Sequence, residues 1–285
     1  MKRVGLIGHP VAHSLSPAVQ NAAFAHHECE ERYELWDTEP SGLETRVREL
    51  RSDGFLGANV TVPYKQAVME YIDRLDPLAA QTGAVNTIVN EGGRLAGHNT
   101  DVTGFAQALS AAGFSTKGKR AAVLGAGGAA RAVGLMLVRE GAASIDLCDL
   151  DVGRAQALAE HLRSLSEGGS VIRAHALSDA AFREAVAGCR LLVNCTPVGT
   201  RHSEFEGQSP LDAEAIPPGA FVFDLVYNPP LTRLMAAAQA RGAQAVGGLS
   251  MLVYQAASSF KLWTGLDAPV DVMLSAAQRA LEGAN

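Results

Sequence analysis

Short apolar segments alternate with stretches of helical periodicity along the first hundred residues. The apolar segments end at Gly, Pro or Asn and predict strands, whereas the stretches between them repeat apolar residues at helical spacing. The predicted elements are strands over residues 4–8, 32–36 and 57–62, helices over 17–25 and 42–51, a helix beginning at Pro63, and a hairpin over 86–97. Strands that alternate with helices favour a mostly parallel sheet.

The same alternation starts again after a predicted helix over 101–112 and a glycine-rich, charged stretch at 113–119. The second series consists of strands over 121–124, 144–148, 191–194 and 221–224 and helices over 129–139 and 154–165. Two last helices, over 251–263 and 270–281, lie outside this pattern and are expected to return to the first domain. The prediction is an α/β protein with an N-terminal α/β domain (1–102 and 249–285) and a Rossmann-type domain (103–248).

Composition narrows the class of protein. The 285 residues suffice for two domains, and 47% of them are hydrophobic. The sequence nevertheless contains no run of about 18 apolar residues, the length that a helix needs to span a bilayer. The four cysteines lack zinc-site spacing, so we expect reduced thiols, a cytoplasmic location and no metal site. A net charge of −6 without basic clusters argues against nucleic acid as a partner.

The turn after the strand at 121–124 carries a phosphate-binding pattern. Gly125, Gly127 and Ala130 occupy the positions of the G-x-G-x-x-G/A motif between a strand and a helix. The first glycine permits a tight turn, the second lets the backbone approach a pyrophosphate, and amides at the helix start face its charge. The alternative is an ordinary turn in an alanine-rich chain. The context favours a nicotinamide-dependent oxidoreductase whose cofactor contacts residues 125–129 (Gly125, Ala126, Gly127, Gly128 and Ala129).

Two carboxylates follow the next predicted strand. Asp149 lies at the distance beyond the glycine loop where a carboxylate binds the adenosine ribose, and Asp151 adds a second negative charge. Because both would repel a 2′-phosphate, the sequence predicts NAD as the cofactor, with NADP as the alternative. A pair of solvated aspartates that caps the helix starting near Val152 would explain the same residues.

Polar residues gather in three loops of the first domain, around Ser14 and Ser16, around Asn59 and Thr61, and between Asn86 and Asp101. Such groups suit a small polyhydroxylated ligand, although the serines and Asn99 could simply cap helices. Lys65 falls in the first turn of the helix predicted to begin at Pro63, where the dipole disfavours a cation. A lysine there needs a compensating partner, unless it is solvated.

Together, these segments resemble the shikimate dehydrogenase family over essentially the whole chain. The matching stretches are 8–17 (GHPVAHSLSP), 57–65 (GANVTVPYK), 83–87 (GAVNT), 99–101 (NTD), 125–129 (GAGGA), 194–197 (NCTP), 224–229 (DLVYNP) and 248–255 (GLSMLVYQ). The resemblance implies reversible hydride transfer between a nicotinamide cofactor and the C3 carbon of shikimate, with 3-dehydroshikimate as the ketone. It also implies that the first domain binds the substrate.

The resemblance assigns roles to individual residues. Lys65 and Asp101 would be the catalytic pair, and Ser14 and Ser16 would hold the substrate carboxylate. The residues expected around the ring hydroxyls are Asn59, Thr61, Asn86, Asp101, Tyr227 and Gln255. The residues added to the cofactor site beyond the glycine loop are Asp149, Asp151, Arg154, Thr196, Leu225, Gly248 and Met251.

The chain departs from the family pattern at two points. NADP-dependent members carry Asn-Arg-Thr where this chain has Asp149-Leu150-Asp151, so only Arg154 remains of the basic pair. In this respect it resembles relatives that use NAD, several of which oxidise quinate. Ser250 replaces a second glycine. The alternatives are therefore an NAD-dependent quinate/shikimate or aminoshikimate-type dehydrogenase or, without catalysis, a nucleotide-sensing regulatory homologue. The expected partners are small molecules, with no membrane, and the chain is expected to be a monomer or homodimer.

Overall fold

The computed structural model describes residues 2–283, so the expected outer domain limits at 1 and 285 lie outside the described residues. The chain divides into two compact units, each built around one six-stranded sheet. The first unit contains the residues up to Phe105 and those from Ser250 onward, and the second runs from Ala106 to Leu249. These boundaries lie slightly later in the chain than the expected ones. The predicted α/β class is confirmed.

The sheet of the first unit is mixed and has the order β2-β1-β3-β5-β6-β4. Its strands are β1 (Arg3–Gly8), β2 (Arg32–Asp37), β3 (Phe55–Val60), β4 (Arg74–Leu75), β5 (Thr87–Glu91) and β6 (Arg94–His98). β1 pairs in parallel with β2 and β3, and β4 pairs in parallel with β6, whereas β5 pairs antiparallel with both β3 and β6. Three of the five strand pairings are parallel, as predicted, and the antiparallel part is the predicted hairpin over 86–97, where the short Gly92-Gly93 turn sends the chain back beside β5.

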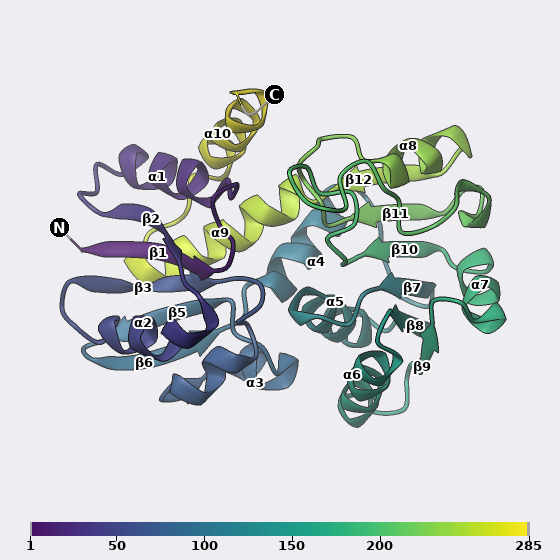
Figure 1. Ribbon diagram of the computed structural model, residues 1–285, viewed down its shortest axis with the longest axis horizontal. Coiled ribbons are helices and arrows are strands. Elements are labelled where there is room, and N and C mark those ends of the chain that lie inside the picture. The colour runs from purple at the N-terminus through teal and green to yellow at the C-terminus, as the bar shows by residue number, and fades with distance from the viewer. Residues whose placement is uncertain (1, 284–285) are drawn as a thin grey trace. The chain divides into compact units, whose positions relative to one another are not determined.

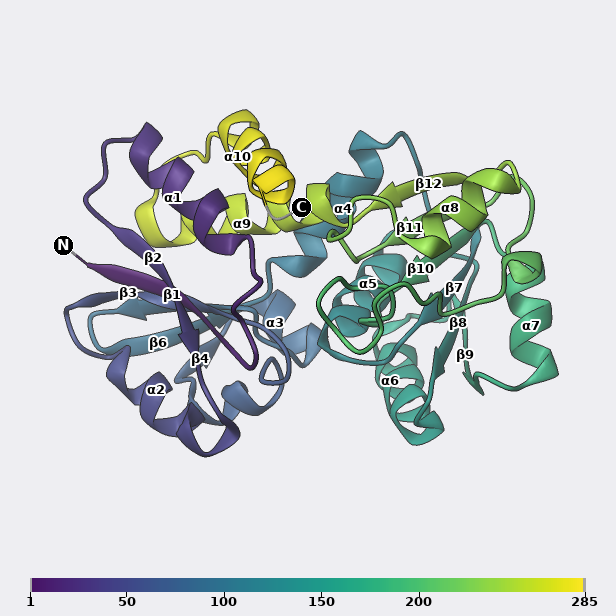
Figure 2. The same cartoon turned by 45° about the horizontal axis from the view of Figure 1, so that its top comes forward.

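Helices cover both faces of this sheet (Figures 1 and 2). They are α1 (Ser16–His26), η1 (Pro40–Gly42), α2 (Leu43–Glu49), η2 (Ala67–Tyr71), α3 (Pro77–Thr82), α9 (Leu249–Thr264) and α10 (Val270–Gly283). The C-terminal α9 packs against α1, where the rings of Phe24 and Phe260 lie 5.2 Å apart. It also reaches the sheet, because Trp263 Nε1 donates a hydrogen bond to the Ile88 carbonyl at 2.9 Å.

The second unit has a fully parallel sheet in the order β12-β11-β10-β7-β8-β9. Its strands are β7 (Arg120–Leu124), β8 (Ser144–Asp149), β9 (Val171–Ala176), β10 (Leu191–Asn194), β11 (Phe221–Asp224) and β12 (Gln244–Gly247). Its helices are α5 (Gly128–Arg139), α6 (Val152–Leu165), α7 (Ala180–Ala187), η3 (Ala213–Ala215) and α8 (Arg233–Ala240), and α4 (Asp101–Ala111) leads into it from the first unit. In Figure 1, α5 and α6 lie on one face of the sheet and α7 and α8 on the other.

The helix predicted to begin at Pro63 is absent from the described residues. The backbone amide of Tyr64 donates to the Thr61 carbonyl in a turn, and the Tyr64 hydroxyl donates to the Thr38 carbonyl. A 3₁₀ helix, η2, begins only at Ala67. Lys65 therefore lies in a turn, and the expected helix dipole does not act on it. Burial of the Tyr64 side chain has overridden the local preference.

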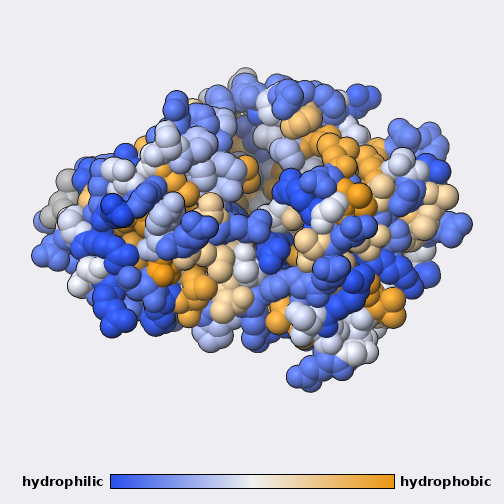
Figure 3. Space-filling view, turned by 60° about the horizontal axis from the view of Figure 1, so that its bottom comes forward, coloured by the Kyte–Doolittle hydropathy of each residue, from blue (hydrophilic) through white to orange (hydrophobic). Residues whose placement is uncertain are grey.

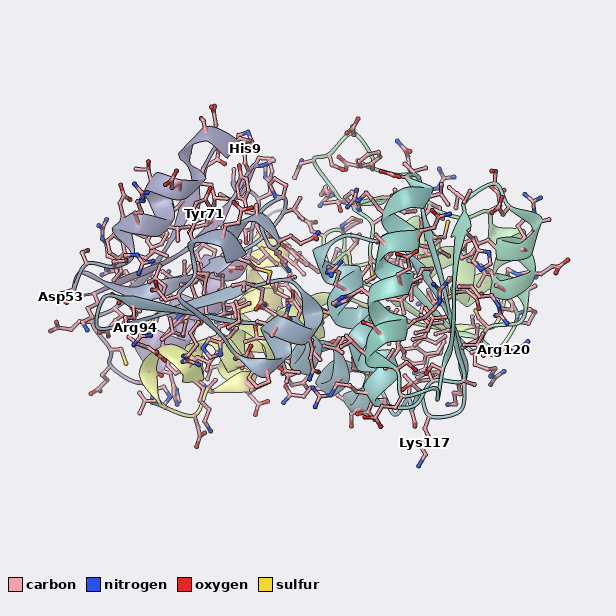
Figure 4. All side chains as sticks on the ribbon, turned by 90° about the horizontal axis from the view of Figure 1, so that it is seen from below. His9, Asp53, Tyr71, Arg94, Lys117 and Arg120 are labelled. Carbon is pink, nitrogen blue, oxygen red and sulfur yellow. The ribbon has the colours of Figure 1, made fainter. Side chains whose placement is uncertain are left out.

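Polar side chains make up much of the molecular surface (Figure 3). Figure 3 shows a largely hydrophilic face with separate hydrophobic patches. In Figure 4, His9 lies just after β1, where its Nδ1 is 2.8 Å from an Asp37 carboxylate oxygen, and Lys117 projects away from the turn before β7. Among the described residues, no helix is both long and apolar enough to cross a membrane.

Candidate functional site

A largely buried lysine–aspartate pair lies beyond the carboxyl ends of β3 and β6 in the first sheet. Lys65 Nζ is 2.6 Å from Asp101 Oδ2, and the two side chains are only 14% and 7% exposed. Lys65 belongs to the turn after β3, and Asp101 is the first residue of α4, directly after β6. Burying a charge costs free energy unless an opposite charge compensates it. Asp101 is therefore the compensating partner that Lys65 needs.

Asn86 holds the other oxygen of this carboxylate. Its amide nitrogen donates to Asp101 Oδ1 at 2.9 Å and to the Thr100 hydroxyl at 2.8 Å. Its amide oxygen accepts the backbone N–H of Thr100 at 2.8 Å, so the amide has a defined orientation. The Gln255 side-chain oxygen lies 3.4 Å from the same Asn86 nitrogen. Residues from three distant parts of the first unit thus meet around one carboxylate.

One of the two serines binds a free amide at the start of α1. The N-cap position of this helix is Leu15, whose side chain cannot accept a hydrogen bond. Ser14 Oγ accepts the backbone N–H of Ser16, the first residue of α1, at 3.2 Å and donates to Ser16 Oγ at 3.1 Å. Capping, the simpler explanation for these residues, is therefore confirmed for Ser14, and Asn99 binds the first amide of α4, that of Asp101, in the same way.

Asn59 and Thr61 differ in what they offer a ligand. Asn59 is only 5% exposed, and its side chain is engaged at both ends by protein. Its oxygen accepts from the Tyr33 hydroxyl at 2.8 Å, and its nitrogen donates to the Asn86 carbonyl and the Thr87 hydroxyl. Thr61 is half-buried in the turn that precedes Lys65. The Asn59 amide is therefore part of the support beneath Asn86.

The glycine loop of the second unit needs its first glycine. Gly125 has a φ of +98°, and a Cβ there would lie 3.2 Å from the backbone of Cys195 and from the Thr196 methyl group. α5 then begins at Gly128, without a side-chain cap from the described residues. A helix start of this kind leaves backbone N–H groups available to an anion. A side chain at position 125 would crowd the neighbouring residues Cys195 and Thr196. These residues therefore fit a dinucleotide pyrophosphate.

The two aspartates after β8 are engaged by backbone amides. Asp149 Oδ2 accepts the N–H of Ala126 at 2.7 Å, and its Oδ1 accepts that of Asp151 at 3.0 Å. Asp151 is the N-cap of α6 and accepts from Gly153 at 2.9 Å and from Arg154. The capping alternative is confirmed for Asp151. Nη2 of the Arg154 side chain lies 3.5 Å from where a side chain at Gly127 would begin.

A buried carboxylate supports the loops after β10 and β11. Asp224 is completely buried and accepts from Asn194 Nδ2 at 2.9 Å and the Thr232 hydroxyl at 2.6 Å. The Asn194 oxygen in turn accepts from the Thr196 hydroxyl at 2.6 Å. Burial raises the pKa of Asp224 despite these bonds. Tyr227 follows in the same loop as Asp224 and is half-buried.

The remaining expected cofactor residues belong to different units. Gly248 packs against Leu225, since a Cβ at 248 would lie 2.1 Å from the Leu225 carbonyl oxygen. Met251 is buried in the first turn of α9, in the first unit. Among the described residues, no group of three or more His, Cys, Asp or Glu is arranged to hold a metal ion.

Several residues that shape these sites were not predicted from the sequence. Ser259 and Tyr33 both form hydrogen bonds with the Asn59 side chain. Their signal in the sequence was weak, because a serine within an apolar helix looks like any small residue. Arg131 lies in the first turn of α5, directly after the glycine loop, and burial lowers the pKa of its guanidinium group.

Comparisons with known proteins give a consistent result. Residues 6–88 match the family model "Shikimate dehydrogenase substrate binding domain", and residues 248–278 match "Shikimate 5'-dehydrogenase C-terminal domain". A shikimate dehydrogenase (NADP(+)) of Moorella thermoacetica is 46% identical over 270 residues, covering 95% of this chain and 90% of that one. The corresponding protein of Symbiobacterium thermophilum is 45% identical, covering 98% and 95%.

A solved structure agrees with these relatives. The shikimate 5-dehydrogenase of Thermus thermophilus, in complex with NADP(H) and shikimate, superposes with a TM-score of 0.87 at 41% identity. The match covers 99% of this chain and 100% of that one.

These relatives overturn one expectation from the sequence, because the preference for NAD is wrong. The similar proteins are named for NADP(+), and the Thermus structure holds NADP(H). The expectation of NAD required Asp149 and Asp151 to be free charges facing a 2′-phosphate. Both carboxylates instead accept hydrogen bonds from backbone N–H groups, which offset part of their negative charge. The Arg154 guanidinium group adds a positive charge beside the glycine loop.

Proposed function

Because this chain belongs to the shikimate dehydrogenase family, we propose that it interconverts 3-dehydroshikimate and shikimate with NADP(H). The observation that carries the proposal is the largely buried Lys65–Asp101 pair beyond the carboxyl ends of β3 and β6, ringed by neutral hydrogen-bonding groups. The chain is accordingly an oxidoreductase. An ammonium group beside such polar groups can supply a proton to a ketone oxygen that gains negative charge.

Lys65 is the general acid of the proposed reaction. The nicotinamide cofactor, when bound, supplies the hydride that reduces C3 of the substrate. As the carbonyl oxygen becomes an alkoxide, the Lys65 ammonium donates a proton to it, and in the oxidative direction the neutral amine takes that proton back. Asp101 holds the ammonium through Oδ2, while Asn86 fixes Oδ1.

Substrate recognition follows from the loops around this pair. The hydroxyls of Ser14 and Ser16 lie 3.1 Å apart at the start of α1, and hydroxyl groups can donate hydrogen bonds to a carboxylate. We assign Thr61, Asn86, Asp101, Gln255 and Tyr227 to the ring hydroxyls. Asn59, whose amide is occupied by protein groups, takes the supporting position behind Asn86.

The cofactor would lie on the second unit's glycine loop. The loop backbone and the start of α5 suit the pyrophosphate, and Arg131 and Arg154 add positive charge there. We assign Thr196, Leu225, Gly248 and Met251 to the remainder of the nucleotide, following the family resemblance. The expected cytoplasmic location, and assembly as a monomer or homodimer, belong to the same proposal.

A steady-state assay tests this function. Purified protein is given shikimate or quinate, each with NADP or with NAD, and formation of the reduced nicotinamide is followed by absorbance. The proposal requires shikimate with NADP to have the highest kcat/KM. A higher value for quinate would indicate the quinate-type alternative, and absence of turnover in all four combinations would favour the regulatory homologue. Light scattering distinguishes a monomer from a homodimer.

A further inference from the structure

Ser259 lies in the middle of α9 and is completely buried. It approaches two side chains of the first sheet, on β3 and β5, and one in the loop between β6 and α4. Its hydroxyl oxygen is 2.8 Å from Thr87 Oγ1, 3.1 Å from Thr100 Oγ1 and 3.1 Å from the side-chain nitrogen of Asn59. It touches neither Lys65 nor Asp101 by any hydrogen bond among the described contacts. Two of its neighbours nevertheless bind the Asn86 side chain: Thr100 at the amide nitrogen and Thr87 at the amide oxygen.

The hydroxyls form a closed ring through the Asn86 amide. The Asn86 nitrogen lies 2.8 Å from Thr100 Oγ1, which lies 3.1 Å from Ser259 Oγ. Ser259 Oγ lies 2.8 Å from Thr87 Oγ1, and Thr87 Oγ1 lies 3.0 Å from the Asn86 oxygen. Ser259 is therefore the link between the two threonines.

When the ring is closed, its hydrogen bonds can run in only one direction. An amide nitrogen can only donate and an amide oxygen can only accept. In the closed ring the Asn86 nitrogen therefore donates to Thr100, Thr100 to Ser259, Ser259 to Thr87, and Thr87 to the Asn86 oxygen. The single hydrogen of the Ser259 hydroxyl has a second acceptor, the Gln255 carbonyl oxygen at 3.0 Å, but Thr87 Oγ1 at 2.8 Å is the closer of the two. The backbone N–H of Thr100, which also bonds the Asn86 oxygen, independently requires the same amide orientation. Hydrogen bonds that share one direction in a buried chain strengthen one another.

We propose that Ser259 is a positioning residue for the reaction, because it closes this ring and keeps the Asn86 amide turned with its nitrogen toward Asp101. That nitrogen has a second hydrogen, which goes to Asp101 Oδ1 and leaves Oδ2 to Lys65. Without Ser259 both threonine hydroxyls lose a partner. An Asn86 amide that turned over would place its oxygen against the Asp101 carboxylate and displace the proton donor.

Kinetic constants of three single variants test the proposal, which rests on the proposed function. Ser259→Ala should lower kcat for shikimate oxidation about tenfold, while KM changes less than about threefold, because misplacement of a catalytic group acts mainly on the chemical step. Ser259→Thr keeps the hydroxyl and should retain most of kcat. The matched control is Ser258→Ala, the neighbour on α9, whose hydroxyl bonds only the Tyr254 carbonyl among the contacts described. It should behave as wild type.

A double-mutant cycle separates positioning from general destabilisation. If Ser259 acts through Asn86, Ser259→Ala should change kcat by less than about twofold in an Asn86→Ala background. Independent effects on folding would instead multiply. Wild-type kcat in Ser259→Ala, a multiplicative cycle, or a loss that merely follows the folded fraction measured by circular dichroism would each overturn the proposal.

Failure of the proposed function can be recognised separately, because the wild-type protein would then turn over neither shikimate nor quinate. In that event the ring is tested through the same cycle in urea-unfolding midpoints. Coupling between Ser259→Ala and Asn86→Ala supports it, and additivity overturns it.

Discussion

Lys65 and Asp101 are far apart in the chain and meet only in the folded protein, where both are buried. Lys65→Ala should lower kcat by about 10²-fold with little change in KM, because it removes the proton donor and leaves the groups proposed to bind the substrate. Steady-state kinetics with shikimate measure both constants. Lys261→Ala is the control, since Lys261 pairs with Asp267 on the surface with 63% of its side chain exposed. Near-wild-type kcat in Lys65→Ala would contradict the assignment.

Asp224 shows how burial acts on a single carboxyl group. Because burial raises its pKa in the folded protein, the folded state holds this proton more tightly than the unfolded state does. Its contribution to stability is therefore greatest below the unfolded pKa of about 4, and is lost as the pH rises through the folded pKa.

Asp224→Asn should remove this pH dependence. The free energy of unfolding of the wild type minus that of the variant should fall as the pH rises from about 4 toward 7. Urea denaturation at a series of pH values measures this difference. A difference that is constant or that increases with pH would show that the hydrogen bonds to Thr232, Asn194 and Val226 outweigh burial.

At the scale of elements, α6 begins at a defined cap. The Asp151 side chain accepts hydrogen bonds from two backbone N–H groups in the first turn of the helix. Asp151→Ala should lower the free energy of unfolding by about 1 kcal/mol, whereas Asp151→Ser, which can cap as well, should lose much less. Thermal or urea unfolding of both variants provides the measurement. Equal losses in the two variants would mean that the charge, rather than the cap, stabilises the helix.

The edge strands β4, β9 and β12 are among the elements that the sequence patterns missed, together with the short helices α3, α7 and α8. β9 (Val171–Ala176) has only two buried residues, Ile172 and His175. Two of its side chains, Arg173 and His175, are polar and pair with Asp146 of β8. β12 has only four residues. Neither has the continuous apolar run that marked the central strands, because an edge strand is covered less completely. The helix expected at Pro63 failed for a different reason, since contacts of Tyr64 with distant residues decide that turn.

At the scale of the whole molecule, the four cysteines differ in accessibility. Cys148 and Cys189 are buried in the second unit, and burial raises the pKa of each thiol to about 12, whereas Cys29 and Cys195 are only partly covered. Since the thiolate is the reactive form, at most two thiols should react quickly with a disulfide reagent near pH 8, and all four after unfolding.

The variant Cys29→Ser/Cys195→Ser should then show no fast-reacting thiol until it unfolds. Rapid reaction of a third thiol in the native wild type would mean that the second unit opens locally far more often than its packing indicates.

The α/β class, the glycine loop and the family could be predicted without a structure, because they depend on local periodicity and on motifs whose residues are close together in the chain. The proposed role of Lys65 also came from a motif. The hydrogen-bond partners of polar side chains could be found only in the folded structure. Asp149 and Asp151 accept hydrogen bonds from backbone N–H groups, and Ser259 is linked to Asn86 through the hydroxyls of Thr87 and Thr100. The physical reason is that a polar group's effect depends on its partners. Most of these partners come from distant parts of the chain, so their hydrogen bonds exist only after folding.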